Sequence, residues 1–252
     1  MKKLALSTVA AVALLAASPA MAVPTVTVTG VTGIWTVTDP TAPDVTGQNT
    51  DTIVWGTPAG GSGQSGYQFQ GVTVPAGPFD LETDFDVGKF IHNNFPIFAP
   101  SLASATLQVT VDVEFQNGGN IPGQLVSNFD FTHFETPNSP SDNICANGEL
   151  NNQGVNENGC ADQVSFVFNP TDSIGVDVPG FGTYFLGLSG FTINGSPATD
   201  FWTIENAANT ADLRGRVTLD PAQVQVPEPG TLALLGIGLL GAGFAARRRH
   251  AA

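Results

Sequence analysis

The chain has 252 residues, of which 22 are acidic and only eight are basic, so its formal net charge at neutral pH is −14. Five of the basic residues lie in the two terminal segments, which leaves three basic and 21 acidic residues in 23–226, a formal charge of −18. Such a chain repels phosphate backbones, which excludes nucleic acid as a partner, and divalent cations are its natural counter-ions. The same charge also keeps an exported protein soluble.

The first 22 residues have the three parts of a secretory signal peptide. Lys2 and Lys3 come first, residues 4–16 are largely apolar, and Ala20-Met21-Ala22 gives the small-x-small pattern of a cleavage site. The sequence therefore predicts export by the Sec machinery, with cleavage between Ala22 and Val23. An uncleaved anchor is disfavoured because the apolar run is short.

Apolar and polar residues alternate along most of the chain that follows. In residues 106–115 every second side chain is apolar, which predicts a strand with one buried and one solvated face. Weaker alternation and short apolar runs predict further strands over residues 26–37, 51–55, 67–74, 129–135, 163–168, 183–188, 191–194, 201–205 and 212–219. Turn residues separate these segments, and no useful helical window occurs. The predicted fold is all-β, one β-sandwich or jelly-roll-like domain over residues 23–222.

Two histidines and one carboxylate form the first candidate site. In a strand, His133 and Glu135 share a face with Phe129 and Phe131, so they lie at the end of an apolar row. Together with His92 they could bind a metal ion as a two-histidine, one-carboxylate group. The favoured alternative is that Glu135 hydrogen-bonds His133 and the pair closes one end of the sandwich, because one partner is enough to satisfy a histidine.

Cys145 and Cys160 are the only cysteines of the chain, with 14 residues between them. In an oxidising exported compartment this spacing predicts a disulfide. Closing a loop of that size stabilises the fold by about 3 kcal/mol in the chain-entropy model. A zinc pair is the alternative, but no further cysteine or nearby histidine completes the ligand set.

The loop around the cysteines, residues 138–162, is rich in carboxylate and amide oxygens, the ligands that calcium prefers. Asp142, Glu157 and Asp162 are its candidate charged ligands, and the disulfide would preorganise them. The loop lacks the alternating aspartates of known calcium loops, so an ordinary solvated loop is the favoured alternative. No nucleophile elbow, phosphate-binding loop or zinc-protease helix is present, so no catalytic residues and no other cofactor are predicted.

Residues 223–252 have the composition of a membrane-targeted tail. Pro227-Glu228-Pro229 comes first, followed by the apolar run 231–246 and three arginines at 247–249. Sixteen residues with four glycines make a marginal span, since a bilayer core needs about 20 apolar residues. The arginines fix its cytoplasmic end. We therefore predict a transmembrane helix over 231–246 that holds the preceding domain outside the inner membrane.

This order of motif, apolar helix and arginine cluster resembles the PEP-CTERM sorting signal. The resemblance implies a substrate of exosortase, a membrane cysteine transpeptidase of Gram-negative bacteria that make exopolysaccharide. It also implies transient anchoring in the inner membrane and processing at or near Pro227, Glu228 and Pro229. Release to the cell surface or the extracellular matrix, or transfer to another anchor, would follow.

The central part of the chain resembles the choice-of-anchor extracellular domains, most closely the K type. The resemblance spans residues 31–219 and implies an extracellular module without assigning it an activity. It depends on five segments in this order: Gly33-Ile34-Trp35, Val54-Trp55-Gly56-Thr57-Pro58, residues 88–97, residues 131–138 and Cys160-Ala161-Asp162-Gln163-Val164.

Two functions remain open at this point. The first is a non-enzymatic structural or binding module associated with exopolysaccharide or biofilm, and the second is a secreted carbohydrate-active enzyme, such as a glycoside hydrolase, or a lectin-like glycan binder. A groove lined by Trp35, Trp55 or Trp202 beside two facing carboxylates would favour the second. Tryptophans buried between the sheets would favour the first.

Overall fold

The computed structural model describes residues 23–219, apart from residues 60, 62, 117–118 and 199. The predicted signal peptide and the predicted tail with its apolar run lie outside the described residues. In the part of the chain that is described, no helix is long and apolar enough to span a membrane.

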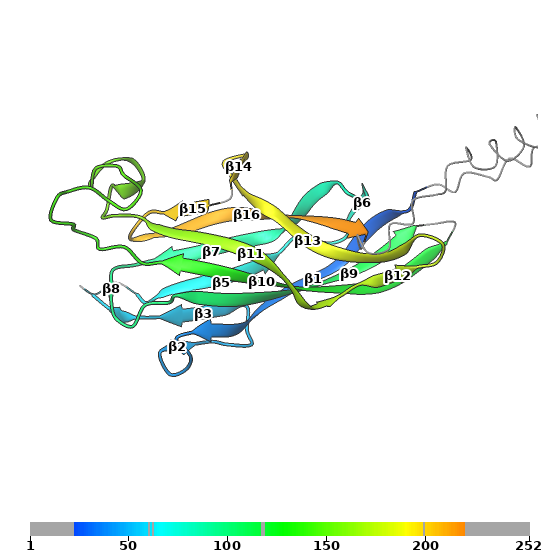
Figure 1. Cartoon of the computed structure of the whole chain (residues 1–252), viewed down its shortest axis with the longest axis horizontal. Helices are drawn as coiled ribbons and strands as arrows, with labels where there is room; N and C mark the ends of the chain where they lie inside the picture. Colours follow the sequence, from blue (N-terminus) through cyan, green and yellow to red (C-terminus); the bar gives the residue numbers. More distant parts are fainter. Residues whose placement is uncertain (1–22, 60, 62, 117–118, 199, 220–252) are drawn as a thin grey trace, which may run out of the picture.

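Two antiparallel sheets lie face to face in a sandwich-like fold (Figure 1). The six-stranded sheet has the strand order β15-β11-β10-β9-β1-β6. Its strands are β1 (Thr25–Asp39), β6 (Ala76–Asp80), β9 (Ser104–Gln116), β10 (Asn120–Phe134), β11 (Asp162–Ile174) and β15 (Asp200–Thr203). The all-β prediction is confirmed.

The eight-stranded sheet has the order β12-β13-β16-β7-β5-β3-β2, with β14 paired to β13. Its strands are β2 (Val45–Thr46), β3 (Thr52–Trp55), β5 (Ser65–Gly71), β7 (Asp84–Asn94), β12 (Val176–Val178), β13 (Gly182–Ile193), β14 (Ser196–Ala198) and β16 (Ala207–Leu219). A small ladder pairs β4 (Thr57–Pro58) with β8 (Ile97–Phe98), and a 3₁₀ turn covers Gly154–Asn156.

The apolar half of each alternating strand fills the space between the sheets. Leu107, Val109 and Val111 of β9 have no exposed area, and neither have Phe129 and Phe131 of β10. Burying one side chain of this size contributes about 1.5–3 kcal/mol relative to leaving it in water. Burial of these alternating apolar side chains is therefore the main source of the fold's stability.

β7 is a central strand that the alternation did not predict as a whole. Val87 and Gly88 are both buried, and the pairing register with β16 shifts between Leu213 and Arg214. This β-bulge reverses the order of buried and exposed positions along β7. The segments on either side of it therefore do not form one continuous alternating pattern. A second register shift, between Leu188 and Gly190, lies inside β13, a single strand that covers two of the predicted strands.

The two ends of the sandwich differ. The long loop between β10 and β11 lies at one end, and the start of β1 and the end of β16 lie at the other (Figure 1). The chain therefore leaves the described domain at the end opposite to this loop.

Candidate functional site

Five ionisable side chains from both sheets meet at the loop end of the sandwich. His92 is on β7, His133 on β10, Asp162 at the start of β11, Glu135 directly after β10, and Glu205 in the turn between β15 and β16. Ligand atoms of His92, His133 and Asp162 lie within 4.8 Å of one another, and so do those of Glu135, Asp162 and Glu205. We call these five residues the buried cluster.

Alternation along the strands places the two histidines inside. His92 follows Phe90 by two residues on β7, and His133 follows Phe131 by two residues on β10, so each ring continues an inward-facing row. The two imidazoles are perpendicular, with centroids 5.2 Å apart, and Trp55 stacks on His92 at 5.8 Å. His92, Asp162 and Glu205 have no exposed area. Aromatic rings thus surround the two histidines, and these three side chains are closed to bulk water.

Hydrogen bonds fix the tautomer of His92. Its Nδ1 lies 2.9 Å from the hydroxyl of Thr203, and that hydroxyl donates to the main-chain carbonyl of Asp162 at 3.1 Å. Because the hydroxyl hydrogen is already used, Thr203 accepts a hydrogen bond from Nδ1–H. Nε2 of the neutral ring therefore carries the lone pair, and it has no hydrogen-bond partner.

His133 has partners at both ring nitrogens. Its Nδ1 lies 2.7 Å from the hydroxyl of Tyr67, and its Nε2 lies 3.3 Å from Glu135 Oε2 and 3.9 Å from Asp162 Oδ2. The favoured sequence interpretation, a Glu135–His133 hydrogen bond at one end of the sandwich, agrees with this geometry. Tyr67 can accept as well as donate, so the opposite tautomer is also open to His133; its Nε2 lone pair is then satisfied by a protonated Glu135 or by a cation.

The buried carboxylates are each held by one oxygen. Asp162 Oδ1 accepts the Thr136 N–H at 2.7 Å. With the Asn138 amide turned so that its oxygen and nitrogen both find partners, Nδ2 donates to Glu205 Oε1 at 3.3 Å. The second oxygen of each carboxylate, Asp162 Oδ2 and Glu205 Oε2, is buried without a partner. Trp55 Nε1 and Asn94 Oδ1 nearby also lack one.

Burial dominates the proton affinities in the cluster. It raises the pKa of Asp162 to about 8, helped by the neighbouring Glu135, and it raises the pKa of Glu135 and of Glu205 to about 7 each. Burial lowers the pKa of His133 to about 4 and that of His92 well below its usual value. The imidazoles are therefore neutral at pH 7 and available as ligands or hydrogen-bond partners.

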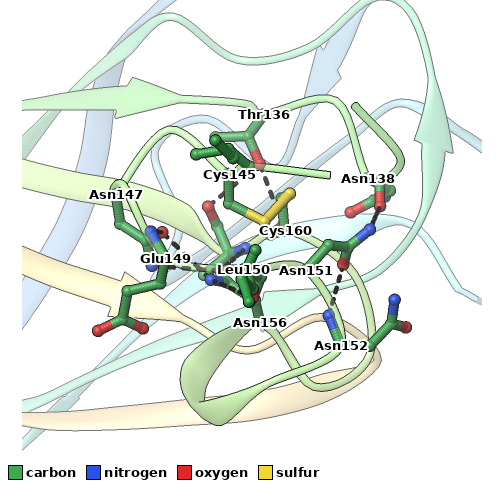
Figure 2. Close-up of a disulfide and its surroundings, with 12 residues drawn as sticks. Thr136, Asn138, Cys145, Asn147, Glu149, Leu150, Asn151, Asn152, Asn156 and Cys160 are labelled. Carbon is green, nitrogen blue, oxygen red and sulfur yellow. Dashed lines mark hydrogen bonds between the residues drawn. A yellow bond between two sulfur atoms is a disulfide. The ribbon is translucent and has the colours of Figure 1, made fainter. Parts of the chain in front are cut away.

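The predicted disulfide is present. Cys145 and Cys160 are bonded, with their Cα atoms 5.3 Å apart, and both are buried (Figure 2). Thr136 Oγ1 donates to the Cys160 carbonyl at 3.0 Å, which ties the bridge to the end of β10. Since Asp162 follows Cys160 by two residues, the bridge positions this carboxylate as well.

Asparagine side chains build the loop from within. The amide of Asn156 exchanges hydrogen bonds with Asn147, and its Oδ1 accepts the Ala161 N–H at 2.9 Å. Asn151 Nδ2 donates to the Asn138 carbonyl at 3.1 Å (Figure 2). Several of the oxygens that suggested a calcium loop are therefore used as internal hydrogen-bond acceptors.

The structure does not bring the predicted calcium ligands together. Asp142 is exposed, and its Oδ1 accepts the N–H of Ile144 at 3.1 Å, while Glu157 is also exposed. Within the described ranges, neither belongs to a group of three clustered ligand atoms. Asp162 instead joins the buried cluster. All three residues named from sequence as a metal group, His92, His133 and Glu135, lie in the cluster with it. Glu205 was missed because only the β15–β16 turn brings it there.

Two of the three tryptophans named as a sugar platform are buried and cannot contact a ligand at the surface. Trp35 and Trp55 have no exposed area and pack between the sheets, and Trp202 on β15 is half-buried. A surface hollow does reach the cluster, with Glu135, Thr136 and Asn138 in its wall. The Glu135 side chain is 21% exposed and lies between this hollow and the buried atoms.

A comparison with known protein families gives a match in the C-terminal tail. Residues 225–249 match the PEP-CTERM protein-sorting motif, and this range includes Pro227, Glu228, Pro229 and the three arginines. No curated protein matches the chain. The choice-of-anchor K-like character of residues 31–219 stays a prediction. The chain therefore carries a PEP-CTERM sorting motif, which supports export to the cell envelope or surface and targeting to exosortase.

Proposed function

We propose that the mature protein is a non-enzymatic structural or binding module of the exopolysaccharide matrix. The observation that carries this proposal is the sorting motif at residues 225–249, attached to a disulfide-bonded sandwich. In this proposal Sec exports the chain, signal peptidase cleaves after Ala22, and the apolar run 231–246 holds it briefly in the inner membrane. Exosortase then processes the Pro227-Glu228-Pro229 region and frees the domain for the surface.

Two features of the domain support a module over a glycan-cleaving enzyme. Trp35 and Trp55 are buried between the sheets and so present no stacking platform to a sugar. The cluster carboxylates are also held inside the sandwich, where a polysaccharide chain cannot pass between them. The end of β16, from which the chain continues to the tail, lies at the end opposite to the long loop.

The test compares the full chain in an exosortase-containing bacterium with the same strain lacking exosortase. Mass spectrometry of the wild-type surface fraction should find Val23 at the start and no peptide beyond the Pro227–Pro229 region. In the strain without exosortase, the arginine tail should persist in the membrane fraction. Recovery of residues 247–249 in surface material of the wild-type strain would overturn the processing route.

The matrix role needs a binding measurement. The released protein should co-sediment with exopolysaccharide from the producing strain, and an exported disulfide protein of similar charge should not. Retention of the protein in a strain that makes no exopolysaccharide, with no binding to the isolated polymer, would contradict a matrix role.

A further inference from the structure

We propose that the buried cluster binds one divalent first-row transition-metal ion of the zinc class. The ligands are His92 Nε2, His133 Nε2 and Asp162 Oδ2, and Glu205 lies within 4.8 Å of Asp162. Such an ion joins the two sheets at the loop end, since His92 belongs to the eight-stranded sheet and His133 and Asp162 to the six-stranded sheet. This site is independent of the proposed matrix role.

The first observation is the convergence of unpartnered atoms. His92 Nε2, Asp162 Oδ2 and Glu205 Oε2 are all buried and all lack a hydrogen-bond partner, although a buried polar atom without one costs about 1–3 kcal/mol. All three belong to residues with no exposed area. A cation between His92 and Asp162, whose ligand atoms lie within 4.8 Å of each other, satisfies two of them at once.

The second observation is that each ligand is oriented through its other polar atom. Thr203 holds His92 Nδ1, Tyr67 holds His133 Nδ1, and the Thr136 N–H holds Asp162 Oδ1. Metal-binding histidines almost always have such a partner on the second ring nitrogen, because it fixes the tautomer and the ring orientation. The arrangement leaves a lone pair of each side chain aimed into the cluster.

The separations suit a metal ion. Ligands about 2.1 Å from one tetrahedral ion lie about 3.4 Å from each other. His133 Nε2 and Asp162 Oδ2 are 3.9 Å apart, and the ligand atoms of His92, His133 and Asp162 are within 4.8 Å of one another. Binding of one ion draws these atoms closer together than they lie in the structure. Binding of the ion to His133 Nε2 replaces the hydrogen bond between His133 and Glu135. Glu135 then lies between the ion and the surface hollow.

The ligand types select the ion. Two imidazole nitrogens with carboxylate oxygens suit zinc and its first-row neighbours, whereas calcium and magnesium prefer shells made of oxygen alone. A hydrogen-bonded carboxyl pair is the competing explanation for the cluster. For Asp162 it requires Oδ2 to contact a neighbouring acceptor or donor, and this atom makes no such bond.

The experiment uses the full chain, exported with its own signal peptide, purified, stripped with a chelator and titrated with Zn²⁺, Co²⁺, Ca²⁺ and Mg²⁺. We expect one Zn²⁺ per chain by elemental analysis. Co²⁺ should give the visible absorption of a site with nitrogen and oxygen ligands. Ca²⁺ and Mg²⁺ at equal concentration should not displace it.

Three variants locate the site. Asp162→Asn keeps the acceptor for the Thr136 N–H but loses the anionic ligand, and it should weaken zinc binding at least about 100-fold. Tyr67→Phe removes only the partner of His133 Nδ1 and should weaken it about 10–100-fold. The matched control is Asp142→Asn, an exposed change in the same loop, which should bind zinc as the wild type does.

Two results would overturn the site. One is wild-type protein with its disulfide intact and native near-UV circular dichroism that takes up no zinc and gives no cobalt spectrum. The other is a folded Asp162→Asn protein that binds zinc with unchanged affinity, or an Asp142→Asn protein that loses as much affinity as Asp162→Asn. If Asp162→Asn fails to fold, the wild-type stoichiometry and the Tyr67→Phe titration still decide.

Discussion

Thr203 and His92 form a hydrogen bond that crosses the sandwich. The Thr203 hydroxyl, on β15 of the six-stranded sheet, lies 2.9 Å from His92 Nδ1, on β7 of the eight-stranded sheet. The same hydroxyl donates to the Asp162 carbonyl, so it fixes the start of β11 as well. One small side chain thereby sets the orientation of a histidine and the position of a carboxylate.

Thr203→Val tests this bond because it keeps the shape of the side chain and removes the hydroxyl. It leaves His92 Nδ1–H buried without an acceptor, which should lower the free energy of unfolding by about 1–3 kcal/mol. Urea unfolding measures the loss. Thr203→Ser is the control and should retain most of the stability. Equal stability of the valine and wild-type proteins would show that the bond contributes nothing.

The disulfide should matter for the whole loop end. Replacing Cys145 and Cys160 together with alanine should cost about 2–5 kcal/mol, the usual loss for a native bridge in an exported domain. Asp142→Asn, an exposed substitution in the same loop, should change stability by less than about 0.5 kcal/mol. Denaturant unfolding of both proteins checks the pair, and free thiols on the folded, non-reduced wild type would contradict the bridge.

How much of the fold could be predicted depended on how regular each strand is. β9 follows strict alternation, and its predicted range, residues 106–115, falls inside the observed Ser104–Gln116. β10 begins at Asn120, well before the predicted start at residue 129, because pairing with β9 over its whole length extends a segment that contains Pro122 and Gly123. Tertiary pairing, which no local pattern records, decided that boundary.

The candidate site was predictable in part for the same reason. His133 and Glu135 are two residues apart, so the period of a strand was enough to place them together. Asp162 was assigned to the loop, although it begins β11 and faces inward with Val164. Glu205 lies in a turn 70 residues beyond Glu135, and only the sheet topology brings them together. The sequence carries no local signal for that contact.

The close packing around Gly88, at the β-bulge in β7, can be tested by substitution. A Cβ added there would lie 2.5 Å from the Gln70 carbonyl oxygen and 2.8 Å from the ring of Phe69. Gly88→Ala should therefore cost about 1–3 kcal/mol, since the backbone and a packed ring must both move. Gly187→Ala on β13 is the matched control, because its Cβ meets nothing within 4 Å. Thermal unfolding of the two proteins should separate them clearly, and equal melting temperatures would refute the packing explanation.

The chelated protein should lose stability as the pH rises from 6.5 to 8. Asp162, Glu135 and Glu205 have raised pKa values of about 8, 7 and 7, so the folded chain holds protons there that the unfolded chain has already released. Stability then falls with pH, by up to about 1.4 kcal/mol per pH unit for each such proton.

The histidines act in the opposite direction, mainly at lower pH. The pKa of His133 is about 4 when folded and close to 6.5 when unfolded, so stability from this ring rises between those values and levels off within about one pH unit above them. His92 behaves in the same way. The carboxyl groups therefore dominate the window from pH 6.5 to 8, and the total loss should be about 1–3 kcal/mol.

Urea unfolding in chelator at pH 6.5, 7.2 and 8 measures this slope. Asp162→Asn should flatten it, because the group with the highest carboxyl pKa no longer titrates. Zinc should abolish or reverse the slope in the wild type, since a bound cation favours the ionised carboxylates and competes with their protons. A chelated wild-type protein whose stability rises from pH 6.5 to 8 would show that the carboxyl groups are ionised and satisfied without a metal ion.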